Sequence, residues 1–297
     1  MINHGTIKAT NGEVGGIIGA LECYKNQLSD IHNYGDVIGT EYVGGIFGWG
    51  ESENRDCTLI DATCKANISG TAYVGCIAGE LSYIAIDSCS NEGSTLTATK
   101  YVTVDGVKYA YVGGLVGCGY AASDCTNSVD INYTGEGRYV GGIMGLSTGC
   151  YVDQTLYYDT LTNEGEIKGY EYVGGIFGAV IFEEDDWYYT NKYTFTDMKN
   201  TANVTGTGDY VGGIFGYFIV EIEGGNGWVY ITDANNSGNI TGKSYVGGIV
   251  GYLTKSTCSS FHGTANSSGI FDPVSTGSVV GSENYGEIYG YSYIAVQ

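Results

Sequence analysis

Three histidines, His4, His32 and His262, are the only imidazole side chains available for acid–base or nucleophilic catalysis in this chain. A serine or cysteine nucleophile would need one of them as its base, and a zinc protease would need a His-Glu-x-x-His string. No such string occurs, and His4 and His32 both lie beside an asparagine in turn-like segments. We therefore interpret them as polar turn residues, and the histidines predict no catalytic constellation.

A run of four acids is the other candidate for chemistry, because two carboxylates can cleave a glycosidic bond and carboxylate oxygens bind calcium. Four adjacent carboxylates repel one another, however, and are typical of a solvated loop, which is the interpretation we favour. Calcium is the one cofactor considered, and no other metal or cofactor is expected. The calcium candidates are Glu183, Glu184, Asp185 and Asp186.

A string of one apolar residue, two glycines, two apolar residues and a glycine recurs along the chain. It occurs in eight copies, whose leading valines are 28 to 38 residues apart: Val14, Val43, Val74, Val112, Val140, Val173, Val211 and Val246. Cys76 replaces the second glycine in one copy, and tyrosine precedes the valine in all but the first. Self-similarity at this period is the signature of a solenoid.

A second element, Asn-x-Gly-x-Ile-x-Gly in its cleanest form, precedes the string by an almost constant distance. It begins at Asn33, Asn163 and Asn284, and in weaker form at Asn200, Asn236 and Cys64. Between Asn91 and Val112 roughly a dozen residues are inserted. Both elements are rich in Val, Ile, Tyr and Thr between glycines, which favours short strands over helices. The pattern predicts an all-β parallel β-solenoid of about eight to nine coils, with roughly three short strands in each.

The two apolar residues that follow the glycines would face opposite sides of a regular strand. Either the strand is covered on both faces, or the chain turns at the glycines so that both point inward; we favour the turn. Stacked coils would then place Val over Val and Tyr over Tyr. The second glycines are expected to be tightly packed or to have positive φ. They are Gly45, Gly114, Gly142, Gly175, Gly213 and Gly248.

The repeats resemble the GLUG motif, which occurs literally as Gly114-Leu115-Val116-Gly117. The resemblance covers nearly the whole chain, although isoleucine usually stands where the family has leucine. It implies a bacterial surface or secreted protein, adhesin-like or beside the protease domain of some immunoglobulin A peptidases. A signal peptide would then lie outside this chain, which we interpret as a single domain, 1–297, from a longer array. The family implies no chemistry for the repeat itself.

The composition narrows the choice of partners. With 12 Lys and Arg against 33 Asp and Glu, the formal charge of −21 argues against nucleic acid, whose phosphates need basic side chains. No apolar run is long enough to span a membrane. The nine cysteines include no Cys-x-x-Cys, so most are interpreted as small buried apolar residues. Pairing of Cys57 with Cys64, or of Cys118 with Cys125, stays open.

The sequence favours a non-catalytic structural or adhesive module that displays variable loops on a rod. A carbohydrate-acting or carbohydrate-binding β-helix is the alternative, and a filament subunit that stacks head to tail is another, since neither end looks like a cap. The expected partner is a host or neighbouring-cell surface protein or glycan. We place the contact surface in loops 180–193, 217–228 and 254–280. Their aromatic residues are either partner contacts or satellite cores: Trp187, Tyr188, Tyr189, Phe218 and Trp228.

Overall fold

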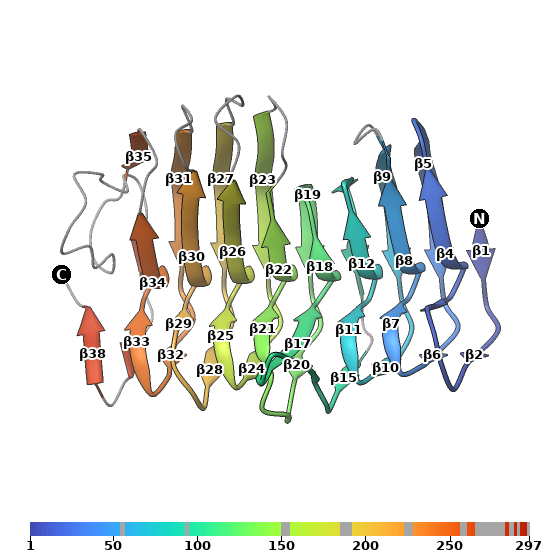
Figure 1. Cartoon of the computed structure of the whole chain (residues 1–297), viewed down its shortest axis with the longest axis horizontal. Helices are drawn as coiled ribbons and strands as arrows, with labels where there is room; N and C mark the ends of the chain where they lie inside the picture. Colours follow the sequence, from blue (N-terminus) through green and yellow to red (C-terminus); the bar gives the residue numbers. More distant parts are fainter. Residues whose placement is uncertain are drawn as a thin grey trace.

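The computed structural model contains four β-sheets, which we name A to D, wound into one β-solenoid (Figure 1). Their strands are parallel except for one antiparallel strand in sheet C. The coils follow one another along a single axis, from β1 (Ile2–Asn3) at one end to β38 (Ser292–Ala295) at the other. The structure describes residues 1–53, 57–92, 95–149, 155–184, 192–222, 228–255, 260–264, 283–284, 288–289 and 292–295. Within these ranges no helix is long and apolar enough to cross a membrane.

Each coil contributes in turn to sheets A, B, C and D. Sheet A contains β1, β5 (Gln27–Asn33), β9 (Cys57–Cys64), β13 (Ile84–Asp87), β14 (Ser90–Asn91), β19 (Ala122–Asn127), β23 (Thr155–Asn163), β27 (Lys192–Asn200), β31 (Trp228–Asn236), β35 (Ser260–Thr264) and β36 (Glu283–Asn284). Sheet B contains β2 (Ile7–Lys8), β6 (Val37–Ile38), β10 (Ile68–Gly70), β15 (Leu96–Ala98), β20 (Ile131–Asn132), β24 (Ile167–Gly169), β28 (Val204–Gly206), β32 (Ile240–Thr241) and β37 (Ile288–Tyr289).

The repeated string supplies the other two sheets. Sheet C contains β3 (Val14–Gly15), β7 (Glu41–Gly44), β11 (Ala72–Gly75), β16 (Val102–Val104), β17 (Val107–Gly113), β21 (Arg138–Gly141), β25 (Glu171–Gly174), β29 (Val211–Gly212), β33 (Ser244–Gly247) and β38. Sheet D contains β4 (Ile18–Cys23), β8 (Phe47–Ser52), β12 (Ala78–Ser82), β18 (Val116–Gly119), β22 (Met144–Thr148), β26 (Phe177–Glu184), β30 (Phe215–Ile222) and β34 (Val250–Lys255).

The chain turns within the repeated string, as predicted, and this corner is the reason that a coil has four strands. In the copy at Val43, β7 ends at Gly44 and β8 begins at Phe47, so the second glycine and Ile46 form the bend. Val43, Ile46 and Phe47 are all at most 1% exposed. Both apolar residues after the glycines therefore face the core, and the valines of successive coils pair directly in sheet C.

The second glycines pack against the neighbouring coil, which confirms the predicted tight packing. At Gly142 a Cβ atom would overlap the carbonyl oxygen of Gly175 and lie 2.6 Å from Cγ of Asn163. The same arrangement recurs at Gly45, Gly114, Gly175 and Gly213, each beneath the next second glycine or Cys76. None of these five glycines has positive φ. Close backbone approach, rather than a left-handed conformation, is thus what requires glycine at the corner.

Buried asparagines form a ladder at the junction of sheets A and B. The side chain of Asn127 donates to Oδ1 of Asn163 (2.6 Å), Asn163 to Asn200 (2.7 Å) and Asn200 to Asn236 (2.6 Å). Each of these donors also bonds the carbonyl oxygen two residues further on, for example Asn163 with Gly165 (2.9 Å). All four amides are 0% exposed. Because a buried amide without partners is costly, this satisfied ladder fixes the stagger between successive coils.

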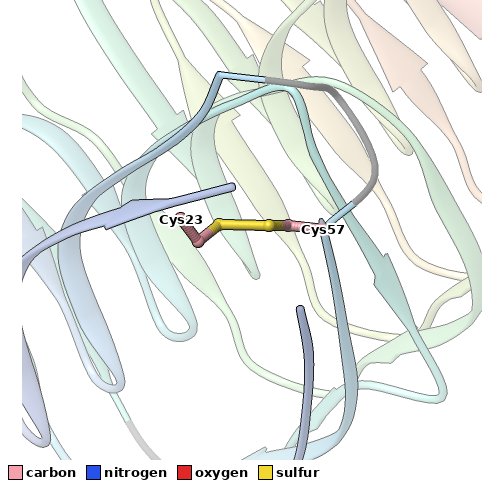
Figure 2. Close-up of a disulfide and its surroundings, with 2 residues drawn as sticks. All are labelled: Cys23 and Cys57. Atoms are coloured by element: carbon pink, nitrogen blue, oxygen red, sulfur yellow. A yellow bond between two sulfur atoms is a disulfide. The ribbon is translucent and has the colours of Figure 1, made fainter. Parts of the chain in front are cut away.

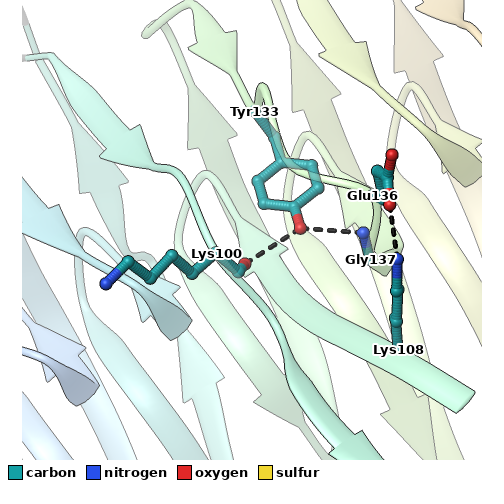
Figure 3. A network of polar contacts seen from close by, with 5 residues as sticks. All are labelled: Lys100, Lys108, Tyr133, Glu136 and Gly137. Atoms are coloured by element: carbon teal, nitrogen blue, oxygen red, sulfur yellow. Dashed lines mark hydrogen bonds and ion pairs between the residues drawn. The ribbon is translucent and has the colours of Figure 1, made fainter. Parts of the chain in front are cut away.

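The residues inserted before Val112 form a hairpin on the edge of the solenoid. β16 pairs antiparallel with β17 around Asp105 and Gly106, both with positive φ, as a tight hairpin turn requires. Tyr133 ties its base down by donating to the carbonyl of Lys100 (2.9 Å) and accepting from the amide of Gly137 (2.8 Å) (Figure 3). Lys108 and Glu136 form an ion pair beside it. The segment between the second element and the repeated string is almost constant in length in the other coils. It tolerates this insertion because the inserted residues leave the coil as a separate hairpin.

Neither cysteine pairing that the sequence left open is formed in the structure. Cys57 forms a disulfide with Cys23, linking the end of β4 to β9 in the next coil (Figure 2). Cys57 is therefore not bonded to Cys64, and Cys118 is not bonded to Cys125. The thiols of Cys64, Cys118 and Cys125 are free. The interpretation as buried apolar residues is confirmed for Cys64, Cys76, Cys89 and Cys125, which are at most 1% exposed.

Candidate functional site

The acidic run and its aromatic neighbours are only partly described. Glu183 and Glu184 end β26 and Trp228 begins β31, so these positions belong to strands rather than loops. The other candidates lie outside the described residues: Asp185, Asp186, Trp187, Tyr188 and Tyr189. Among the residues that are described, no group of three or more His, Cys, Asp and Glu side chains could hold a metal ion. The calcium site and the loop surface stay predictions.

Phe218 is a core residue, so its assignment as a partner contact is wrong. Strand β30 continues to Ile222 instead of opening into a loop at Tyr217, and this places Phe218 on the inward face. Its side chain is 0% exposed, and its ring packs against those of Phe195 and Phe215 at centroid distances of 5.4 and 5.0 Å. For this residue the satellite-core alternative was closer to the outcome.

The structure describes the side chains of two histidines, His4 and His32, and both make local contacts. His4 stacks on Tyr34 with 4.9 Å between ring centroids, and Nε2 of His32 lies 2.8 Å from Oδ1 of Asp30. Both pairs lie near the surface of the first coils, and neither imidazole faces a nucleophilic hydroxyl or thiol in these contacts. The predicted turn position holds for His4, which follows β1, but not for His32, which lies in β5.

The tyrosines that precede the valines form one continuous row, which we call the tyrosine stripe. Successive rings lie 4.3–5.4 Å apart between centroids along the whole series. Tyr111, Tyr139, Tyr172 and Tyr210 pack in an apolar cluster separate from the main core. Tyr139 and Tyr172 are at most 9% exposed, and the other five rings are partly exposed. The stripe consists of Tyr42, Tyr73, Tyr111, Tyr139, Tyr172, Tyr210 and Tyr245.

Every tyrosine of the stripe has a left-handed backbone, with φ between 49° and 75°. This conformation costs a bulky L-residue roughly 1–2 kcal/mol, and asparagine or glycine would adopt it more easily. Ring pairs contribute about 0.5–1.5 kcal/mol each beyond the area they bury, which offsets the strain. The conformation turns the ring out of the core between two inward residues, such as Ala72 and Val74 on either side of Tyr73. The left-handed backbone thus places an aromatic ring on the outer side of each coil from Tyr42 to Tyr245.

A second row, on the outer face of sheet D, borders the stripe. Its members pair in register across sheet D: Trp49, Glu80, Cys118, Leu146, Ala179, Tyr217 and Tyr252. At one end of the rod Tyr217 packs edge-on against Tyr172 and Tyr210, at 4.7 and 5.4 Å. The two rows together are mostly apolar and aromatic, and their middle members are at most 9% exposed: Tyr139, Leu146, Tyr172 and Ala179.

Glu80 places a carboxylate within this aromatic surface. It lies between Trp49 and Cys118 in register and interacts electrostatically with Tyr42 and Tyr111. Burial raises the pKa of Glu80, with a smaller contribution from Glu51, while a hydrogen bond from Ser82 (3.1 Å) opposes the shift. The arrangement places a hydrogen-bond acceptor beside the rings of Trp49, Tyr42 and Tyr111.

The stripe should make the fold sensitive to alkali. Burial raises the pKa of Tyr73, Tyr111, Tyr139 and Tyr172 above the ordinary value of 10.0. Because the folded state favours the neutral phenol, these groups stabilise it fully below about pH 10, and that stability is lost as the pH rises further. From these phenols we expect the melting temperature to fall as the pH rises above about 10.

Melting curves recorded with tyrosinate absorbance test this expectation. Tyr73→Phe/Tyr111→Phe, which keeps the rings and removes two phenols, should lessen the alkaline loss. Tyrosine ionisation that is complete near pH 10 with an unchanged melting temperature would contradict it.

No family model, curated protein or solved structure matches the chain. The sequence did predict that tyrosines stack, but not that they lie outside the core on left-handed backbone. A related signal was missed in sheet A, where Asp30, Asp61, Asp124, Asp197 and Asp233 all have positive φ. Each stands three residues before a ladder position, a spacing that repeats visibly in the sequence.

Proposed function

We propose that this chain is a non-catalytic structural and adhesive module of a bacterial surface or secreted protein, related to the GLUG-motif repeats, and that the tyrosine stripe is its contact surface. One observation carries the proposal: seven tyrosines whose rings contact one another occupy equivalent outer positions on successive coils at the cost of a strained backbone. Tyrosine is among the residues that contribute most to binding surfaces. A row of equivalent sites also allows many weak contacts to act together along an extended partner.

Two further features support an extracellular place for the module. The disulfide between Cys23 and Cys57 is of a kind that persists in oxidising compartments. The formal charge of −21 keeps a long rod soluble and favours neutral or basic partners over acidic polymers.

A glycan is the ligand class that a specific observation favours. Pyranose rings present C–H faces that pack on aromatic rings and hydroxyls that need acceptors. Trp49, Tyr73 and Glu80 offer both kinds of contact within the stripe and its bordering row. A protein partner would use the same rings but would not need an acceptor beside them, so Glu80→Met, which removes both carboxylate oxygens, separates the two ligand classes.

Asparagine variants test the stripe without adding backbone strain, since asparagine tolerates the left-handed conformation. We expect Tyr73→Asn/Tyr111→Asn to weaken binding to a glycan array or to cultured cells at least about tenfold, a loss of about 1.4 kcal/mol. Tyr157→Asn is the matched control, because Tyr157 is 59% exposed on sheet A, away from the stripe. Equal binding by the double variant and the wild type, with both folded by circular dichroism, would refute the stripe as the contact surface.

A further inference from the structure

Two neighbouring contacts of the tyrosine stripe have its shortest ring distances. Tyr42 and Tyr73 stack with 4.4 Å between ring centroids and 25° between ring planes, and Tyr73 and Tyr111 stack with 4.3 Å and 16°. By contrast, Tyr139 meets Tyr172 edge-on, with 5.4 Å between centroids and 62° between planes. The stripe therefore contains both face-to-face and edge-on contacts between chemically identical groups.

The three closest rings also share one orientation. Tyr42, Tyr73 and Tyr111 precede valines that pair in register on parallel strands, and their backbone φ angles are 49°, 52° and 51° for Tyr42, Tyr111 and Tyr73. Equivalent side chains on parallel strands with the same backbone conformation point to the same side. The phenol groups of Tyr42 and Tyr73 are hydrogen-bonded to each other. The ortho carbons, which flank each hydroxyl, therefore lie beside those of the next ring.

Access to solvent separates the same two sets of rings. Tyr42, Tyr73 and Tyr111 are partly exposed, whereas Tyr139 and Tyr172 are at most 9% exposed. A partly exposed ring can meet a dissolved oxidant and can tilt away from the sheet. A ring enclosed by close-packed neighbours has little freedom to do either. The stacked end of the stripe is thus the part that is open to chemical modification.

We propose that Tyr42, Tyr73 and Tyr111 are a site of oxidative cross-linking, at which a one-electron oxidant converts two stacked phenols into a dityrosine that joins successive coils. Each phenol gives one electron to the oxidant and its hydroxyl proton to water, which leaves two phenoxyl radicals. The two unpaired electrons form a bond between one ortho carbon of each ring. The hydrogens on these carbons then move, as protons, to the phenoxyl oxygens. Two tyrosines thus lose two electrons and two protons, and two equivalents of the oxidant are reduced.

The stacking makes the coupling step intramolecular. Holding two reacting groups in contact removes the entropic cost of bringing them together, and Tyr73 has a second phenol on either side. Tyr24 and Tyr157 are more exposed, at 63% and 59%, but contact no other aromatic ring among the described residues. Exposure alone therefore does not select the site. The proposal does not depend on the stripe binding a glycan, because it requires only the stacked rings.

Peptide mapping of the oxidised chain tests the proposal. Tris(bipyridyl)ruthenium(III), generated by light and persulfate, is the one-electron oxidant. Cleavage after Lys, Arg, Asp and Glu yields peptides 42–51 and 66–80, whose single tyrosines are Tyr42 and Tyr73. We expect these two peptides to be joined by a dityrosine bond in the monomer fraction isolated after oxidation. Absence of this linked pair from the monomer, or its presence in cross-linked dimers only, would overturn the proposal.

Phenylalanine variants test which rings couple, because phenylalanine keeps the ring and removes the phenol. Tyr73→Phe should abolish the linkage of peptide 42–51 and lower the dityrosine fluorescence of the monomer. Tyr42→Phe should leave peptide 66–80 linked to 109–124, the peptide that contains Tyr111. Tyr172→Phe is the matched control, since it removes a phenol from the edge-on contact and should leave the fluorescence unchanged. Equal losses in Tyr73→Phe and Tyr172→Phe would show that stacking does not select the site.

Discussion

Valine in place of Gly175 is expected to lower the free energy of unfolding by at least about 2 kcal/mol. A Cβ at this position would overlap the carbonyl oxygen of Gly213 in the next coil and lie 2.6 Å from Cγ of Asn200. Neither atom can move without breaking contacts between coils, because the carbonyl belongs to the next corner and the amide belongs to the ladder.

Chemical denaturation of the variant measures this effect, and Gly5→Ala is the matched control. A Cβ at Gly5 meets nothing closer than 3.6 Å, so that variant should unfold at the wild-type midpoint. An unchanged midpoint for Gly175→Val would show that the corner does not depend on close backbone packing.

Leucine in place of Asn163 is expected to cost about 3 kcal/mol or more, although it has nearly the same size. The substitution removes the Asn163 oxygen that accepts from Asn127 and the Asn163 amide that donates to Asn200 and to the carbonyl of Gly165. The three groups that bonded to Asn163 then stay buried without this partner. Each buried group that loses its partner costs about 1–3 kcal/mol, so the losses add up along the ladder.

Asn132→Leu is the comparison, because Asn132 is exposed on sheet B and its replacement should change stability by no more than about 0.5 kcal/mol. Hydrogen exchange should also show faster opening of β19 and β27 in Asn163→Leu, the two strands that flank Asn163 in sheet A. A variant as stable as Asn132→Leu would mean that the ladder fills space and contributes little through its hydrogen bonds.

The repeat itself carried most of the information about the fold. Eight copies of one string predicted a parallel solenoid, and two adjacent apolar residues after the glycines predicted the corner, since regular alternation would expose one of them. The same reasoning did not predict that the corner divides the string between sheets C and D. Each coil therefore has four strands and not the roughly three that were expected. Asn127 was not recognised as a copy of the second element, because neither the second residue after it, Val129, nor the sixth, Tyr133, is glycine.

The candidate site was harder to predict, because it depends on which side of the backbone a residue faces. Stacking of tyrosines follows from the period, but their outward position depends on a left-handed φ that sequence patterns associate with asparagine or glycine. Phe218 shows the converse error: a strand that continued past the expected boundary buried a residue that looked available to a partner. The partner of Cys57 likewise depends on which residues of successive coils meet, and not on their spacing in sequence.

Binding and cleavage measured together on one panel of polysaccharides test the central claim most directly. The account predicts that the purified chain is retained on at least one glycan, that Tyr73→Asn/Tyr111→Asn is not retained, and that no reducing ends are released by either protein. Release of reducing sugar that is abolished by alanine at Glu183, Glu184, Asp185 and Asp186 would contradict it and would make the chain an enzyme.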